Sequence, residues 1–191
     1  PGGPRPFDLQ RDGLCLGDGA VVLRVEAREE TDATPLAFIT GWGISNDANH
    51  ITGPSRDGSG LVNAIRPALE MANTKPEEIG AWCAHGTATV YNDGMELCAR
   101  DTIFGEKSIP IFSVKGAIGH TLGAAGGIET ALCAKALETG KIPPTVGCNE
   151  PEPRAESVVS SGPQTFTIPR LLKTNSGFGG VNAELVVEAA P

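Results

Sequence analysis

Residues 113–127 read SVKGAIGHTLGAAGG and combine titratable side chains with close-packing ones. Lys115 is followed five residues later by His120, and a run rich in glycine and alanine follows the histidine directly. Three interpretations are open: a phosphate-binding loop, a tightly packed core helix, or one edge of a catalytic pocket. The run lacks the GxxxxGK(S/T) spacing of a phosphate loop, and its glycines would equally let a helix pack closely.

Segments of strand and helix character alternate around this run. Apolar, β-branched stretches indicate buried strands, and apolar residues at helical spacing indicate helices. The expected strands are 14–27, 35–45, 79–84 and 109–114, with three more near residues 158, 172 and 186. The expected helices are 59–73, 93–104 and 121–140. We therefore expect an α/β fold in which helices cover a partly parallel, mixed sheet.

Composition and charge exclude several kinds of partner. At 191 residues, 40% of them hydrophobic, the chain is long enough for a domain with a real core. The net charge of −8 argues against nucleic acid, and no apolar run approaches the roughly 18 residues of a membrane span. The five cysteines form no CxxC pair, which indicates a reducing, cytoplasmic setting and no zinc site. We expect no metal and no cofactor.

Polar or aromatic side chains follow three of the expected strands. They are His85, Lys115 with His120, and Phe178 among its glycines. The carboxyl ends of strands are where open α/β sheets place their sites. A lone histidine is more often a hydrogen-bonded core residue, so the signal comes from all three occurring together. His50 lies in a polar loop and is expected to stand outside the site.

Five ordered motifs point to one family. Residues 84–99 (AHGTATVYNDGMELCA) are similar to HGTSTPxGDxxE, and residues 113–129 (SVKGAIGHTLGAAGGIE) to STKxxxGHxxGAAGxxE. Residues 6–20, 142–153 and 176–188 are similar to PFD…RDG…GEGA, PPTxNxxxPDP and GFGGTNAxLV. With these motifs, essentially the whole chain resembles the C-terminal half of a β-ketoacyl-acyl carrier protein synthase of the elongating type. The resemblance implies a thiolase-like layered fold.

The resemblance also implies a chemistry and its residues. In this family a cysteine thiolate takes an acyl group, and a malonyl thioester then loses carbon dioxide to give the attacking enolate. His85 and His120 match the pocket histidines that stabilise the enolate oxygen. Lys115 and Glu96 match the family lysine and acid, and a buried ammonium needs a carboxylate, so we predict that these two pair. The oxyanion hole and acyl gate are expected at Phe178, Gly177 and Gly179.

The chain departs from the family pattern at a few positions. Asp18 stands where the family has Glu, and Ala88 and Val90 replace a serine and a proline beside His85. Ser176 stands where many members carry a second aromatic residue, which leaves the acyl chain length and the choice between fatty acid and polyketide open.

The resemblance divides the chain into residues 1–33, the tail of the N-terminal half, and 34–191, the C-terminal ketosynthase domain. None of the five cysteines has the DTACSS-like context of the family nucleophile, so we expect this chain to be inactive alone. The expected partners are the N-terminal half of the same enzyme, an acyl carrier protein bearing phosphopantetheine thioesters and, in the full-length protein, a second copy in a homodimer.

Two other assignments are open. The chain is alternatively a non-catalytic subunit of a ketosynthase heterodimer, similar to a chain length factor. Retention of both His85 and His120 favours the enzyme, because buried polar groups are costly without a function. A thiolase is the weaker alternative, since thiolases carry a catalytic cysteine near a glycine-rich turn in their C-terminal half and this chain has none.

Overall fold

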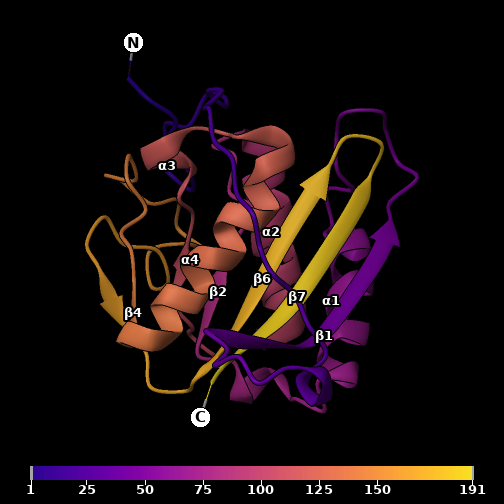
Figure 1. The fold of residues 1–191 in the computed structure, drawn as a ribbon. Helices are drawn as coiled ribbons and strands as arrows, with labels where there is room; N and C mark the ends of the chain where they lie inside the picture. The colour runs from indigo at the N-terminus through magenta and orange to yellow at the C-terminus, as the bar shows by residue number, and fades with distance from the viewer. Residues whose placement is uncertain (1, 191) are drawn as a thin grey trace.

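The computed structural model describes residues 2–190 and contains a five-stranded mixed sheet (Figure 1). The strand order is β1 (Ala37–Asn46), β7 (Val181–Ala189), β6 (Arg170–Gly177), β2 (Ala81–Cys83) and β3 (Ile111–Phe112). β1, β7 and β6 pair antiparallel, whereas β6, β2 and β3 pair parallel. The expected mixed α/β sheet is confirmed, and its parallel part places the carboxyl ends of three strands at one edge.

Helices cover both faces of this sheet. α1 (Ser59–Met71) and α2 (Val90–Phe104) lie on one face and α4 (Ala125–Thr139) on the other, where Figure 1 shows it in front. The shorter elements are α3 (Lys115–Ile118), the 3-10 turns η1 (Arg28–Glu30), η2 (Pro76–Glu78) and η3 (Leu122–Ala124), and the antiparallel pair β4 (Lys141–Ile142) and β5 (Gln164–Thr165).

Side chains along β6 and β7 alternate between two cores, one on each face of the sheet. Leu172 and Val186 pack in the core under α1 and α2, whereas Leu171 and Val187 pack in the core under α4. The same alternation divides four polar residues between the faces. They are Lys173 and Asn175 on the α4 face, and Thr174 and Glu184 on the α1 and α2 face.

The predicted strand over 14–27 is wrong. Within it only Leu16 makes a bridge, to His120, and the rest runs as irregular chain in front of α4 (Figure 1). Val22 is 97% exposed, because no strand of the described residues lies beside it. β-branched residues favour an extended backbone, but a strand also needs a hydrogen-bonding neighbour. At Gly17 the segment packs directly against the backbone that follows β3. A β-carbon at this position would lie 1.9 Å from the carbonyl oxygen of Ile118, so the close approach requires glycine.

Other element ends differ from the sequence prediction. α2 begins at Val90 rather than at residue 93, because the Thr89 side chain caps it. α4 begins at Ala125 rather than at residue 121, since a 3-10 turn comes first. The strand predicted near residue 158 is also wrong, because residues 153–158 form turns and Val159 makes one isolated bridge to Ile111.

Gly43→Ala is expected to destabilise the fold by about 1–3 kcal/mol, because β1 and α1 meet through glycine. A β-carbon on Gly43 would lie 2.0 Å from the carbonyl oxygen of Ala64, and one on Gly41 would lie 2.1 Å from that of Ala68. Both obstacles are helix backbone and cannot rotate away. Gly123→Ala is the matched control, since its β-carbon would meet nothing within 4 Å. Urea unfolding followed by circular dichroism measures the difference, and equal stabilities would contradict the prediction.

Candidate active site

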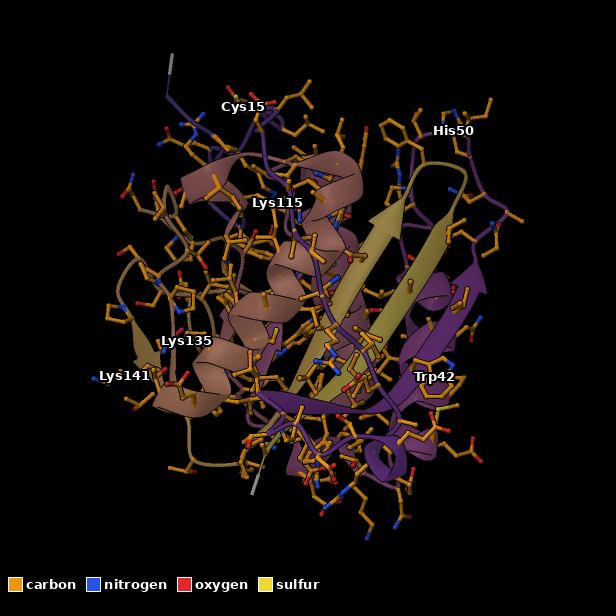
Figure 2. All side chains as sticks on the ribbon, viewed as in Figure 1. Cys15, Trp42, His50, Lys115, Lys135 and Lys141 are labelled. Atoms are coloured by element: carbon orange, nitrogen blue, oxygen red, sulfur yellow. The ribbon has the colours of Figure 1, made fainter. Side chains whose placement is uncertain are left out.

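Three parallel strands deliver polar side chains to one edge of the sheet. His85 follows β2, Lys115 begins α3 shortly after β3, and Asn175 lies near the end of β6. At this edge Lys115 Nζ lies 3.3 Å and Asn175 Nδ2 lies 3.1 Å from His85 Nδ1. The side chains of the motifs at residues 84–99 and 113–129 therefore lie together at this edge, as the sequence predicted. His50 lies apart, in the exposed loop before α1 (Figure 2).

The imidazole rings of His85 and His120 pack edge to face, with centroids 5.1 Å apart and planes at 82°. Nδ1 of His85 faces the Lys115 ammonium, which can only donate, so Nδ1 accepts and the ring proton sits on Nε2. Nδ1 of His120 accepts a hydrogen bond from the Leu122 N–H at 3.1 Å, which again places the proton on Nε2. Both rings therefore carry an Nε2–H donor.

The surroundings of both rings favour the neutral imidazole. Burial lowers the pKa of His85 well below its usual value, and the charge of Lys115 lowers it further. Burial and Lys115 also lower the pKa of His120, although Glu129 acts in the opposite direction. A neutral ring with a fixed N–H can donate to a developing oxyanion without carrying charge in the ground state.

The predicted ion pair between Lys115 and Glu96 is wrong. The Lys115 ammonium lies 2.5 Å from Oε1 of Glu129 and 2.5 Å from the carbonyl oxygen of His85. Both members of this pair are buried, and Figure 2 shows Lys115 inside the molecule. Glu129 ends the motif of residues 113–129 and lies one turn before Cys133 on the buried side of α4. A charged residue at such a position needs a buried partner, and that signal was present in the sequence.

Glu96 instead holds the backbone that carries His85. Its Oε1 accepts hydrogen bonds from the His85 N–H at 2.7 Å and the Thr174 hydroxyl at 3.1 Å. Its Oε2 accepts from the Gly86 N–H at 2.7 Å and the Asn92 amide at 3.0 Å. Burial raises the pKa of Glu96 to about 7, and the backbone hydrogen bonds act against this rise. Glu96 thus positions the histidine loop without touching Lys115.

Two buried charged residues of the last hairpin escaped the sequence analysis. Lys173 is 2% exposed, and its ammonium lies 3.3 Å from Oε2 of Glu129. Glu184 is 1% exposed, and neither carboxyl oxygen has a well-formed hydrogen bond to a described residue. Burial raises the pKa of Glu184 well above its usual value, against the opposing charge of Lys173. The two-residue period of strands places them on the faces of Leu171 and Val186, which could have revealed both.

Phe178 lies at the tip of the β6–β7 hairpin and is 74% exposed. β6 runs parallel to β2, so both strands end at the same edge of the sheet. The tip that follows β6 therefore lies at the same edge as His85, which follows β2. Gly179 adopts a φ of +82°. Its N–H donates to the Ile51 carbonyl at 2.7 Å, which connects the tip to the loop between β1 and α1. The roles expected for Phe178, Gly177 and Gly179 in an oxyanion hole and acyl gate stay predictions.

Residues 2–190 contain no group of three or more His, Cys, Asp or Glu side chains arranged to hold a metal ion. Over the same range, no helix combines the length and the apolar composition that crossing a membrane requires.

Known proteins share this sequence and geometry. Residues 36–149 match the family model described as beta-ketoacyl synthase, C-terminal domain. The chain is 37% identical over 188 residues to 3-oxoacyl-(acyl-carrier-protein) synthase 2 of Staphylococcus aureus, covering 95% of this chain and 47% of that protein. It therefore spans about half the length of such relatives.

Solved structures give the same result. The ishigamide ketosynthase/chain length factor superposes with a TM-score of 0.93 at 35% identity, covering 100% of this chain and 48% of that one. A type II polyketide synthase acyl-carrier protein in complex with its ketosynthase bound to the hexaketide gives a TM-score of 0.93 at 31% identity. That match covers 98% of this chain and 48% of the other.

Proposed function

The chain belongs to the β-ketoacyl synthase family as its C-terminal domain, and on that premise we propose that it forms one side of a decarboxylating condensing site. The complete synthase would join a malonyl unit on an acyl carrier protein to an acyl thioester. This chain would supply the two histidines and their supporting charges, and the nucleophilic cysteine would come from the N-terminal half. The boundary near residue 34 belongs to the same proposal.

The pair of Nε2–H donors on His85 and His120 is the observation that carries this proposal. When malonyl thioester loses carbon dioxide, the electrons of the broken C–C bond move onto the thioester oxygen. Two N–H donors from neutral rings stabilise that charge as it develops. The enolate carbon then attacks the acyl thioester, a C–C bond forms, and the cysteine thiolate leaves.

The supporting charges fit the same reaction. The buried Lys115 ammonium contacts Nδ1 of His85 and so holds the Nε2–H of that ring ready to donate to the enolate oxygen. α4 begins five residues after His120, and the positive end of its dipole would also favour a developing anion beside that histidine. We propose that Phe178, Gly177 and Gly179 complete the site as acyl gate and oxyanion hole once the N-terminal half is in place.

The proposed partner is an acyl carrier protein. One structural relative is described as a ketosynthase in complex with its acyl-carrier protein. Carrier proteins are acidic, and this chain has a net charge of −8. Docking would therefore rest on a few local Arg and Lys side chains or on the other half of the enzyme, since like charges repel.

A subunit without catalytic function, similar to a chain length factor, is the second candidate. Two structural relatives are described as a ketosynthase together with a chain length factor. Such a subunit has no need of two ring donors, one fixed by a buried ammonium and the other by a backbone N–H. The arrangement of His85, His120 and Lys115 therefore favours the enzyme.

In the complete synthase, His85→Ala and His120→Ala are each expected to lower decarboxylation of malonyl carrier protein by about 10²–10³-fold, the usual effect of losing one oxyanion donor. Acyl transfer to the cysteine should persist, because neither ring is needed to form the thioester. Mass spectrometry of the carrier protein and of the acylated enzyme measures both steps.

His50→Ala is the matched control and should leave both rates unchanged, since His50 lies in an exposed loop. Normal decarboxylation in both pocket variants would reject the enzyme assignment and leave the second candidate.

A further inference from the structure

Lys173 lies beside the histidine site but belongs to none of the motifs. Its ammonium is buried under α4 and contacts two groups, Oε2 of Glu129 at 3.3 Å and Oδ1 of Asn175. An ammonium can only donate hydrogen bonds, so the Asn175 side chain must turn its oxygen toward Lys173. Glu129 accepts from the opposite end of the same amide, so Lys173 and Glu129 together fix its orientation.

The orientation of Asn175 has a direct effect on His85. With its oxygen on Lys173, the amide directs Nδ2 toward two acceptors, Oε2 of Glu129 at 2.9 Å and Nδ1 of His85 at 3.1 Å. Lys115 Nζ approaches the same ring nitrogen at 3.3 Å. Nδ1 thus faces two groups that donate, and it can accept from them only while it carries no proton.

We propose that Lys173 is a positioning residue for His85: it orients Asn175, and its charge together with that orientation keeps the ring neutral with the proton on Nε2. The protonation state of the ring is a property of this chain. Only the catalytic consequence rests on the proposed function.

Charge around the ring supports the same conclusion. The ionisable groups that face His85 come from every element packed against it. They are Lys115 of α3, His120 of the following turn, Glu129 of α4, Lys173 of β6 and Glu96 of α2, which binds the backbone. Two ammonium groups share the Glu129 carboxylate, which leaves an excess of positive charge beside the ring. Burial, Lys115, His120 and Lys173 all lower the pKa of His85.

Nitrogen-15 NMR of histidine-labelled protein tests this inference without an activity assay. In the unaltered chain, His85 should appear as the Nε2–H tautomer and stay neutral on acidification. In Lys173→Met the amide oxygen of Asn175 loses its donor and Glu129 alone holds the amide, so a fraction of the molecules should turn it and move the ring proton to Nδ1. The ring should also become doubly protonated at a higher pH than in the unaltered chain, because one positive charge has gone.

Lys141→Met is the matched control, because Lys141 is exposed on β4 at the periphery of the molecule (Figure 2). It should change neither the tautomer nor the pH of protonation. Should Lys173→Met not fold, Lys173→Gln removes the same positive charge and takes its place. Asn175→Asp tests the second step of the inference, that the atom of residue 175 facing Nδ1 sets the tautomer. A carboxylate oxygen facing Nδ1 can only accept, so the ring proton should move to Nδ1. If His85 stays in the Nε2–H form and protonates at the control pH in the folded variants, the inference is overturned.

The complete synthase adds a kinetic test. Lys173→Met should lower kcat for decarboxylation by about tenfold, the effect of losing one charge-assisted hydrogen bond, and move the acidic limb of the pH profile to higher pH. An architectural role alone would lower stability without moving that limb. If the NMR result holds but the unaltered synthase does not decarboxylate malonyl carrier protein, the proposed function fails and the assignment of Lys173 stands.

Discussion

Replacing Lys115 with alanine is expected to lower decarboxylative condensation about 100-fold in the complete synthase. The ammonium donates to Nδ1 and the carbonyl oxygen of His85, so its loss removes one of the two donors that keep Nδ1 unprotonated and lets part of the rings place their proton there. Nε2 would then present a lone pair to the enolate oxygen and repel it. Losing an oxyanion donor typically costs about 10²–10³-fold in kcat.

The same change should also reduce stability. Removing one member of a buried ion pair typically costs about 3–5 kcal/mol, although Lys173 would still contact Glu129 and reduce that cost. Rates must therefore be compared at a temperature where circular dichroism shows the variant folded.

Lys135→Ala is the control for this experiment. Lys135 lies on the same helix as Glu129, but it is exposed and, among residues 2–190, forms an ion pair with Glu138 alone (Figure 2). Its replacement should leave turnover unchanged and alter stability by no more than about 0.5 kcal/mol. Near-normal condensation by a folded Lys115→Ala variant would show that the lysine is architectural.

Glu184→Met is expected to raise the free energy of unfolding at pH 8 by about 1–4 kcal/mol, the range seen when buried ionic groups are replaced by apolar ones. The Glu184 carboxyl is buried under α1 and α2, and its oxygens lack well-formed hydrogen bonds to described residues. At pH 8 the fold must either bind a proton there or bury a poorly solvated charge. Methionine of similar length removes both costs.

The pH dependence gives the sign of the effect. Burial raises the pKa of Glu184, so above its ordinary value of 4.5 the folded chain keeps a proton that the unfolded chain releases. The free energy of unfolding therefore falls as pH rises, by up to about 1.4 kcal/mol per pH unit for this group. Asp93 and Glu96, whose pKa values burial raises to about 6 and about 7, act in the same direction up to those values.

Urea unfolding between pH 4.5 and 8 measures this slope. Glu184→Met should have a shallower slope than the unaltered chain and should approach its stability at the acidic end. Glu188→Gln is the control on the same strand, since Glu188 is partly exposed and paired with Arg170. Equal slopes in Glu184→Met and the unaltered chain would contradict a proton held on Glu184.

The sequence predicted a mixed, partly parallel sheet covered by helices, although not its strand order. The polar residues after strands predicted that His85, Lys115 and His120 would meet, because parallel strands end at one edge. The antiparallel pairing of the last two strands was also within reach. Residues 178–180 alone separate them, a connection too short for parallel strands, which need a crossover of about a dozen residues.

The partners of the site residues were harder to predict. A motif supplies residue types but no distances, so Glu96 and Glu129 were equally available to Lys115. Only the three-dimensional position of α4 selects Glu129. The strand predicted over 14–27 failed for a related reason. Local composition favours an extended backbone, whereas a strand depends on a neighbour that local composition does not specify.

The short strands that carry the site have a consequence for how the protein folds. β2 and β3 are too short to be aligned by local helices and turns alone. Their alignment depends on contacts such as the hydrogen bond from Trp82 to Thr174, which joins residues 92 positions apart. Contacts of such long sequence separation form slowly, because a large loop must close first. The histidine pair should therefore assemble in the last stage of folding, and hydrogen exchange should detect protection of β2 and β6 after that of α1 and α4.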